Sequence, residues 1–119
     1  MAFGEHTGRF SPVVAAVGLD HVRLSYEYLD RGDHDGYASL LDPAATVDEP
    51  GRSGRRLRSR GEHRLNEVFA ADGRVAAVGR FVGADVLGEP VDVDFADIFA
   101  LSPSGLLLRR RSYYHVDPE

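Results

Sequence analysis

The sequence contains no cysteine, and all fourteen of its basic residues are arginine. Without cysteine, the chain cannot form a disulfide, a thiolate nucleophile or a thiolate zinc site. Without lysine, it cannot form a Schiff base with a carbonyl substrate or with pyridoxal phosphate. Any catalytic chemistry must therefore use carboxylates, histidines, tyrosines, serines and arginines.

Long hydrophobic runs are also missing. No run approaches the length of a membrane span, and the N-terminus lacks a basic region followed by an apolar segment. We therefore expect a cytoplasmic protein that does not associate with membranes. Basic residues that are all arginine, together with abundant alanine and glycine, are typical of a GC-rich genome and indicate a bacterial source.

The five histidines are scattered, and none forms a close pair at metal-binding spacing. We therefore predict no metal site. Most histidines in such positions are structural, but His21 and His63 remain alternatives as acid–base groups of a pocket.

Five arginines lie in the segment from Arg52 to Arg60. Clustered positive charge is typical of nucleic-acid binding. However, the net charge is −5, and the segment lacks the aromatic residues on which bases would stack. We interpret the segment as a solvated, mobile loop, with substrate or partner docking as the alternative, and predict no nucleic-acid partner.

A length of 119 residues with 43% apolar content predicts one globular domain. Residues 1–10 show no periodicity and are expected to form a flexible N-terminus, so that the domain comprises residues 11–119. Ser11 followed by Pro12 predicts a helix start. This first helix is expected to end at Gly32, because apolar residues recur at helical spacing up to that point: Leu19, Val22, Tyr26 and Leu29.

Asp33 predicts the cap of a short second helix, which Pro43 is expected to end. Its inward-facing residues would be Tyr37, Leu40 and Leu41. The rest of the chain favours strands, beginning with a short apolar segment around Val47. Residues 65–71 and 74–82 flank the hairpin signal Asp72-Gly73, and residues 91–101 and 106–116 flank a second turn at 102–105. This order predicts an α+β domain whose N-terminal helices pack on a curved antiparallel sheet that encloses a pocket.

Strand alternation indicates which side chains face that pocket. Asp97 is the single acid on a face that it shares with Val91, Val93, Phe95 and Phe99. In the last strand, Arg110 shares a face with Leu108, Ser112 and Tyr114, unless the register slips by one residue. Arg110 is then a fixed cation that can pair with Asp97 or Glu49, or bind a substrate oxygen. For Asp97, the alternative is an inert structural ion pair.

The strand that starts near Ala45 brings a carboxylate, Glu49, towards an apolar interior. A carboxylate in such a place must be paired, protonated or used in chemistry, because it loses its hydration. The alternative is that Glu49 lies at an exposed strand end, since glutamate is seldom fully buried.

These features together resemble the NTF2-like superfamily, specifically its SnoaL-like polyketide cyclase and ketosteroid isomerase branches. The resemblance covers residues 19–116. It rests on the order of elements, the Gly32-Asp33 helix break, the segment Ala45-Thr46-Val47-Asp48-Glu49-Pro50, and a closing hairpin with Asp-Ile-Phe-Ala-Leu at 97–101 and Arg-Arg-Arg-Ser-Tyr-Tyr at 109–114. The resemblance implies a cone-shaped fold, a hydrophobic small-molecule substrate and a homodimer.

The resemblance also implies roles for individual residues. Glu49 takes the position of the isomerase base. Asp97 takes that of a second carboxyl group, which is kept protonated to donate a hydrogen bond to the developing oxyanion. Ser25 stands where the isomerases have a tyrosine, and Tyr26 is the next residue, turned by about 100° around the helix. The candidate catalytic residues are Glu49, Asp97 and Arg110, and the candidate substrate-binding residues are Ser25, Tyr26, Phe81, Phe95, Phe99 and Tyr114.

The function expected from this set is cofactor-independent acid–base catalysis on a hydrophobic, carbonyl-rich small molecule. A SnoaL-like cyclase or isomerase of polyketide-type secondary metabolism fits best. One alternative is an epoxide hydrolase or epoxide-opening cyclase that uses Glu49, Arg110 and Asp97. Another is a non-catalytic ligand-binding or accessory dimer, which would pair through the outer sheet face around Val78 and Val82.

Overall fold

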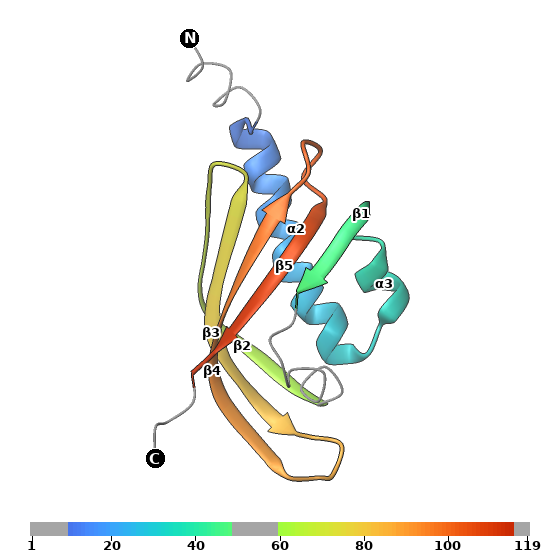
Figure 1. Cartoon of the computed structure of the whole chain (residues 1–119), viewed down its shortest axis with the longest axis vertical. Coiled ribbons are helices and arrows are strands. Elements are labelled where there is room, and N and C mark those ends of the chain that lie inside the picture. The colour runs from blue at the N-terminus through green and yellow to red at the C-terminus, as the bar shows by residue number, and fades with distance from the viewer. Residues whose placement is uncertain (1–9, 49–59, 116–119) are drawn as a thin grey trace.

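The computed structural model describes residues 10–48 and 60–115, which form two helices and one five-stranded sheet (Figure 1). The helices are α2 (Pro12–Arg31) and α3 (His34–Ala38). The strands are β1 (Leu41–Asp48), β2 (Arg60–Ala71), β3 (Arg74–Ala84), β4 (Pro90–Leu101) and β5 (Leu107–Tyr114). Helices precede strands, as the sequence predicts for an α+β domain.

Both helix starts are capped by the residues that the sequence indicates. The Ser11 hydroxyl accepts a hydrogen bond from the Val14 amide at 3.3 Å, and Asp33 Oδ1 accepts one from the Gly36 amide at 2.8 Å. Helix α2 ends at Gly32, whose φ of +73° lies in the left-handed region. The chain therefore turns from α2 into α3 at the predicted break.

The sequence prediction that Pro43 ends the second helix is wrong. Helix α3 ends at Ala38, Ser39 caps it, and Pro43 lies inside β1. Proline is tolerated there because β1 is an edge strand, and its pairing with β5 is interrupted between Leu41 and Thr46. No ladder hydrogen bond is needed from the position of Pro43.

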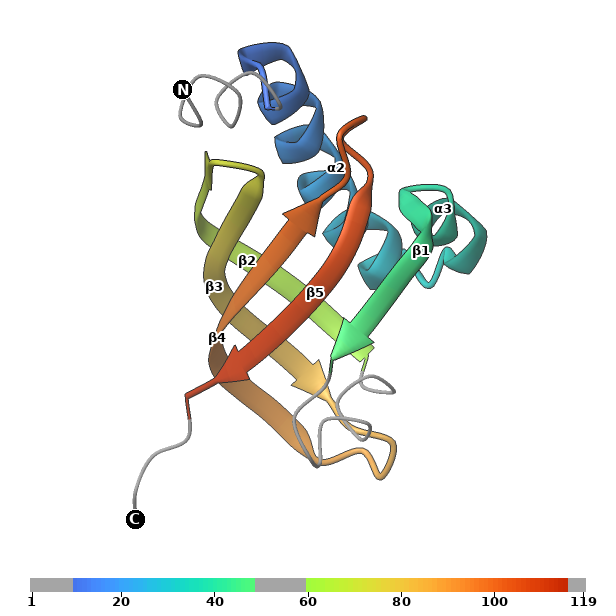
Figure 2. The same cartoon turned by 45° about the horizontal axis from the view of Figure 1, so that its top comes forward.

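The strand order is β1-β5-β4-β3-β2, and the sheet is curved and not closed (Figure 2). The pairs β2–β3, β3–β4 and β4–β5 are antiparallel, as expected. Strand β1 instead pairs parallel with β5, so the expectation of a purely antiparallel sheet is corrected. Strands β1 and β2 lie at opposite edges of the sheet, so they do not form a hairpin with each other although they are consecutive in the chain.

The two predicted hairpin turns are confirmed, and the strands of the first hairpin are longer than predicted, whereas β5 is shorter. Asp72 and Gly73 both have positive φ, 53° and 79°, which is the geometry of a tight two-residue hairpin. Strand β3 continues to Ala84, and β2 begins at Arg60. Arg60 therefore belongs to a strand and not to the predicted loop, while residues 52–59 lie outside the described residues.

Helix α2 packs against one face of the sheet in both views (Figures 1 and 2). Its residues Val22 and Tyr26 are at most 2% exposed. They join a core that comprises Leu40, Val75, Ala77, Phe81, Phe95, Phe99, Leu101 and Leu107. The same face of the sheet therefore carries both the hydrophobic core and the residues from which a site would be built.

Strand β5 contains a register shift that changes which leucine enters the core. Leu107 pairs with Leu101, and Arg109 pairs with Ala100, so that Leu108 has no partner of its own on β4. Leu107 is 2% exposed, whereas Leu108, which alternation placed on the inner face, is only half-buried. From Arg110 onward the predicted alternation is confirmed, with Arg110 and Ser112 buried and Arg109 and Arg111 exposed.

Candidate functional site

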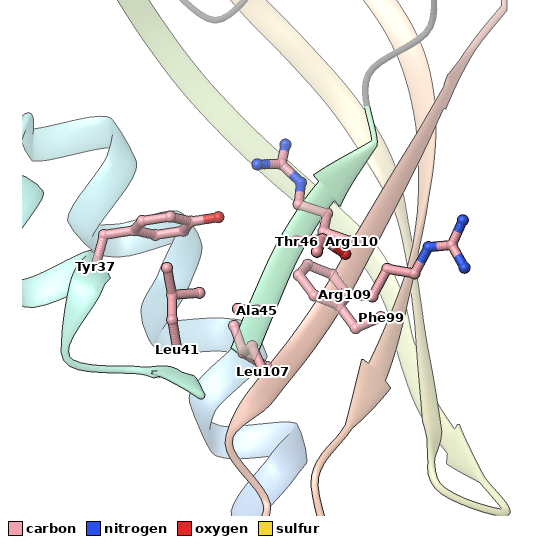
Figure 3. A pocket seen from close by; sticks show the side chains of 8 residues that line it. All are labelled: Tyr37, Leu41, Ala45, Thr46, Phe99, Leu107, Arg109 and Arg110. Atoms are coloured by element: carbon pink, nitrogen blue, oxygen red, sulfur yellow. The ribbon is translucent and has the colours of Figure 1, made fainter. Parts of the chain in front are cut away.

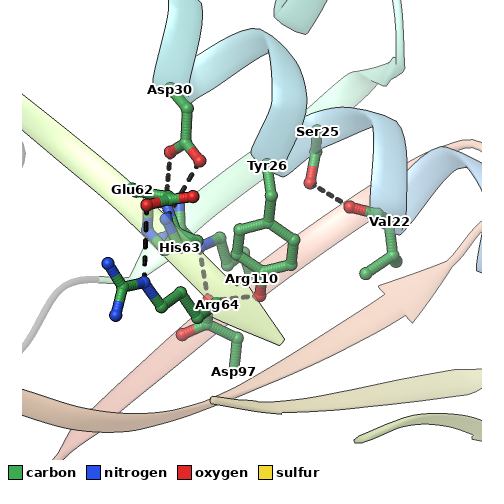
Figure 4. Close-up of polar contacts among 9 residues, drawn as sticks. All are labelled: Val22, Ser25, Tyr26, Asp30, Glu62, His63, Arg64, Asp97 and Arg110. Atoms are coloured by element: carbon green, nitrogen blue, oxygen red, sulfur yellow. Dashed lines mark hydrogen bonds and ion pairs between the residues drawn. The ribbon is translucent and has the colours of Figure 1, made fainter. Parts of the chain in front are cut away.

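Three residues from three elements form a buried polar network in the interior (Figure 4). Tyr26 of α2, Asp97 of β4 and Arg110 of β5 are 2%, 1% and 7% exposed. The Tyr26 hydroxyl donates a hydrogen bond to Asp97 Oδ2 at 2.6 Å, and Arg110 Nε lies 3.5 Å from the same oxygen. The structure thus brings together Asp97 and Arg110, for which pairing was one expectation, and Tyr26, which the sequence predicts as a substrate-binding residue.

The ionisation of this network follows from its burial and its charges. Burial, the negative charge of Asp97 and the hydrogen bond to it all raise the pKa of Tyr26 far above its usual value. Burial alone would lower the pKa of Arg110, but the charge of Asp97 and the neighbouring Tyr37 and Tyr26 outweigh that effect and raise it. Tyr26 is therefore a neutral hydrogen-bond donor, and Arg110 is a permanent cation.

Part of the network has no hydrogen-bond partner among the described residues. The buried atoms concerned are Asp97 Oδ1, Arg110 Nε and Ser112 Oγ. Arg110 Nε is close enough to Asp97 for an ion pair but does not meet the geometry of a hydrogen bond. Ser112 is the cross-strand partner of Asp97, so both side chains lie on the same face. Buried polar atoms are nearly always paired, so such a group requires an explanation, and a bound ligand or water is one.

Arg110 also lines a narrow pocket between α3, β1 and β5 (Figure 3). The pocket has room for about one water molecule. Its other lining residues are Tyr37, Leu41, Ala45, Thr46, Phe99, Leu107 and Arg109. In β1, the register places Val47 opposite Arg110, so the strand that leads to residue 49 lies directly beside the network. Glu49 itself lies outside the described residues.

Most of the predicted aromatic residues meet around Tyr26. Phe81, Phe95 and Phe99 are at most 5% exposed. The Tyr26 ring lies 5.8 Å from the ring of Phe95 and 6.1 Å, edge-on, from that of Phe99. Tyr114 is half-buried and packs against this core.

Ser25 is buried, but its hydroxyl donates a hydrogen bond to the Val22 carbonyl within its own helix, at 2.6 Å. Tyr26, the next residue along α2, therefore supplies the hydroxyl that reaches Asp97.

A second polar pair lies beside the network, and it includes a residue that the sequence did not single out. Asp30, in the last turn of α2, contacts His63 of β2 (Figure 4). Asp30 Oδ1 lies 2.6 Å from His63 Nδ1, and Asp30 Oδ2 accepts a hydrogen bond from the His63 backbone amide at 2.9 Å. The sequence does contain a signal for Asp30: it follows Tyr26 by four residues, so the two side chains are expected on the same face of the helix.

The two alternative histidines differ in location. The His63 ring packs 4.9 Å from the ring of Tyr26, 4.8 Å from that of Phe81 and 5.4 Å from that of Phe95. His21 Nδ1 instead contacts the Gly105 carbonyl oxygen at 2.7 Å, in the turn between β4 and β5. Of these two histidines, His63 is therefore the one beside the network.

Within residues 10–48 and 60–115, no group of three histidine or acidic residues is arranged to hold a metal ion. In the same part of the chain, no helix is both long and apolar enough to cross a membrane.

Comparison with known proteins identifies the fold. No protein-family profile and no curated protein matches the sequence. Three solved structures of similar shape are an NTF2-like protein of unknown function from Burkholderia pseudomallei, a protein described as a SnoaL-like polyketide cyclase from Jannaschia, and an LEH-like epoxide hydrolase from Mycobacterium tuberculosis.

Each similarity extends over most of both chains. The TM-scores are 0.73, 0.73 and 0.71, and the sequence identities are 17%, 16% and 15%. The aligned parts cover 83%, 87% and 85% of this chain, and 91%, 88% and 84% of the others. Identities this low support a statement about fold alone. The protein has the NTF2-like fold.

Proposed function

We propose that the protein is a cofactor-independent acid–base enzyme that acts on a hydrophobic, carbonyl-bearing small molecule. A SnoaL-like cyclase or isomerase of polyketide-type secondary metabolism fits this description best. The observation that carries the proposal is the buried Tyr26–Asp97–Arg110 network with its unpaired oxygen, Asp97 Oδ1.

Such a network is a poor choice for stability alone. Removing two charges from water costs several kcal/mol per ion, and replacing a buried ion pair by apolar residues is often neutral or stabilising. An inert structural pair would also be expected to satisfy its own hydrogen bonds. Asp97 Oδ1 does not do so among the described residues, which favours a role in binding.

The chemistry follows from the donors and their fixed positions. In the proposed reaction, Glu49 removes a proton next to a substrate carbonyl, and the carbonyl oxygen develops negative charge. The cation Arg110 stabilises that oxygen. Asp97, which accepts the single hydroxyl proton of Tyr26, holds Arg110 in place. The apolar walls formed by Phe81, Phe95, Phe99 and Tyr114, with the helix surface at Ser25, would bind the substrate folded so that its own atoms react.

Hydrogen–deuterium exchange into 2-tetralone tests the proposal, because it requires a base and a stabilised enolate but no known natural substrate. The wild-type protein in D₂O should accelerate exchange at the carbon next to the carbonyl, as followed by NMR. Asp97→Asn and Glu49→Gln should each lower that rate by about 10²-fold or more. Asp94→Asn is the matched control, because Asp94 is exposed on the opposite face of β4.

Equal exchange rates for the wild type and Asp97→Asn would contradict the proposal. Circular dichroism and urea unfolding of each variant establish that a lost rate does not reflect an unfolded protein.

The same residues support one alternative reaction, the opening of an epoxide. Asp97 and Arg110 supply a carboxylate beside an arginine, and Glu49 would supply a second carboxylate. One carboxylate would activate water or a substrate hydroxyl, and the other would protonate the epoxide oxygen. Incorporation of labelled solvent oxygen into the product would distinguish hydrolysis from intramolecular ring formation.

We also propose that the protein functions as a homodimer. The outer face of the sheet carries exposed or half-buried apolar side chains, among them Phe69, Val78, Val82 and Tyr113. A two-fold pairing through this face would leave the inner face, and therefore the site, free to bind substrate.

A further inference from the structure

We propose that His63 is a proton-transfer group of the interior site and that Asp30 is its positioning residue. This inference rests on the proposed acid–base function and adds a second catalytic side chain to it. It comes from the geometry of the Asp30–His63 pair and from where that pair lies.

Asp30 holds His63 at two points. One carboxylate oxygen accepts the backbone amide of His63 at 2.9 Å, and the other lies 2.6 Å from Nδ1. The two contacts fix the strand position and the ring orientation together. A histidine ring that served only to fill space between α2 and β2 would not need both contacts with Asp30.

The contacts also determine which ring nitrogen carries the proton. An ionised carboxylate only accepts hydrogen bonds, and Asp30 already accepts the His63 amide. Nδ1 is therefore the donor to Asp30, and in the neutral ring Nε2 has a free lone pair. Among the described residues, no side chain or backbone group hydrogen-bonds to Nε2, so it is available to a substrate proton.

The His63 ring lies beside the Tyr26–Asp97–Arg110 network and is mostly buried. His63 contacts the ring of Tyr26, which donates to Asp97, and it packs against Phe81 and Phe95 as well. The side chains of His63 and Asp30 are only 15% and 23% exposed. A base and an oxyanion-stabilising group thus lie side by side, as proton abstraction next to a carbonyl requires.

The neighbouring charges on β2 face the other way. Arg64 and Glu62 form an ion pair with each other, and their side chains are 61% and 64% exposed. Strand alternation places both on the face opposite His63. The charge that acts directly on the His63 ring is therefore that of Asp30.

In the proposed step, a substrate C–H or O–H proton other than the one that Glu49 removes moves to Nε2, while the electron pair of the broken bond remains on the substrate. The resulting imidazolium is stabilised by the adjacent Asp30 carboxylate. It then returns the proton to a different substrate atom, which completes an isomerisation or ring closure. Protons and electrons balance within the substrate and His63, and no further reactant is needed.

The test uses 5-nitrobenzisoxazole, a planar aromatic molecule that a general base converts to 2-cyano-4-nitrophenolate. The base takes the C3 proton, the C–H electron pair forms the nitrile, and the N–O bond breaks to give the coloured phenolate. The reaction needs a base in an apolar environment and no carbonyl polarisation. It therefore reports on His63 separately from the Asp97 network that the 2-tetralone assay requires.

His63→Gln retains a donor for Asp30 and should lower kcat/KM for this probe by about 10²-fold or more. Asp30→Asn should also lower it, because an amide donor at Nδ1 forces the proton onto Nε2. The controls are His34→Gln and Asp20→Asn, which change exposed side chains elsewhere on α3 and α2 and should leave the rate unchanged.

Tautomer-sensitive ¹H–¹⁵N spectra provide a readout that does not depend on activity. The wild-type ring should carry its proton on Nδ1, and the ring in Asp30→Asn should carry it on Nε2. A wild-type ring protonated on Nε2 would overturn the inference.

The kinetic outcomes separate this inference from the proposed function. If kcat/KM for 5-nitrobenzisoxazole is unchanged in His63→Gln but lost in Glu49→Gln, His63 is not the base. The proposed acid–base function would then still hold. A wild-type rate no higher than that of free imidazole at the same concentration would count against both. Loss of turnover in His63→Gln, with the controls active, supports the inference.

Discussion

At the scale of single residues, the interior is organised around one carboxylate, Asp97. It is 1% exposed, and it accepts from Tyr26 while lying within ion-pair distance of Arg110. Both donors contact the same oxygen, Oδ2, and the second oxygen is left without a partner among the described residues. The proposed binding role of Asp97 rests on this asymmetry, because one oxygen anchors the carboxylate and the other has no partner among the described residues.

Replacing the tyrosine by phenylalanine tests how strongly the network depends on its hydroxyl. Tyr26→Phe removes the donor to Asp97 Oδ2, so we expect the free energy of unfolding at pH 7 to fall by about 1–3 kcal/mol. Urea unfolding measures this loss. Tyr28→Phe is the control, because Tyr28 lies on the same helix, is only half-buried, and its hydroxyl makes no hydrogen bond among the described residues.

The stabilities of the wild type and of Tyr26→Phe should depend differently on pH. Burial and the charge of Asp97 raise the pKa of Tyr26 in the folded state, whereas an unfolded tyrosine ionises at about pH 10. Above that pH the folded state retains a proton that the unfolded state loses, so the stabilisation by Tyr26 decreases as pH rises. The difference in stability between wild type and Tyr26→Phe should therefore narrow from pH 9 to pH 11. A constant or widening difference would contradict this account.

Sequence patterns identified some of these residues and missed others for physical reasons. A strand has a period of two, so alternation identifies the neighbours of Asp97 and of Arg110 within each strand. That the two residues share one face depends on the register between β4 and β5, which the sequence left open. The choice between Ser25 and Tyr26 depended on how α2 is rotated against the sheet, which only packing decides. The contact between Asp30 and His63 joins a helix end to an edge strand 33 positions away. No local period encodes a contact of that kind.

At the scale of elements, β2 follows the curvature of the sheet through a register shift between Leu65 and Glu67. Gly79 of β3 lies opposite Leu65, and a Cβ placed on Gly79 would collide with the backbone carbonyl oxygen of Arg64. The two strands approach so closely here that only glycine fits. This close approach lies next to the strand segment that carries His63.

Two glycine-to-alanine substitutions compare the stability cost of a Cβ that meets backbone atoms with that of a Cβ that meets a side chain. Gly79→Ala should lower the free energy of unfolding by about 1–3 kcal/mol, because a backbone carbonyl cannot move aside without distorting the sheet. In Gly18→Ala of α2, the three atoms nearest to the new Cβ all belong to the Leu101 side chain. A side chain can shift more readily than a backbone carbonyl, and the gain in helix propensity of about 1 kcal/mol partly offsets the crowding, so we expect a smaller loss of stability than in Gly79→Ala.

Urea unfolding of both variants measures the difference. A Gly79→Ala protein as stable as Gly18→Ala would show that β2 and β3 can separate at little cost.

The elements themselves were largely predictable because their ends carry local signals. Ser11, Gly32, Asp33 and the Asp72-Gly73 turn each act through hydrogen bonds or backbone angles within a few residues. The prediction for Pro43 is wrong because proline not only ends helices but is also tolerated in edge strands, and β1 is an edge strand. Whether β1 is an edge strand, and whether it runs parallel to β5, depends on strand order. Strand order is a property of the whole sheet.

At the scale of the whole molecule, the sheet has two faces of different character. The inner face carries the core and the proposed site. The outer face has an apolar centre of exposed or half-buried residues: Phe69, Ala76, Val78, Ala96, Ile98 and Tyr113. Charged residues border this centre. Among them, Arg80 hydrogen-bonds to Asp92 through Nη2 and Oδ2 at 2.9 Å, and this hydrogen bond holds the pKa of Asp92 below its usual value. An apolar centre with a polar border is typical of a protein interface.

The proposed homodimer follows from this face and can be tested by placing a charge at its centre. In a two-fold pairing, the same patch meets itself, so a charge introduced at Val78 would face or approach its own copy in a desolvated interface. Val78→Glu should convert a wild-type dimer into a monomer in sedimentation equilibrium while leaving the circular dichroism spectrum unchanged. The control is Leu87→Glu, since Leu87 is 76% exposed in the turn between β3 and β4, away from the outer-face centre. A wild-type protein that sediments as a monomer, or a Val78→Glu variant that remains dimeric, would count against this interface. If the dimer is lost, exchange into 2-tetralone should persist in the monomer, because every described residue of the proposed site comes from one chain.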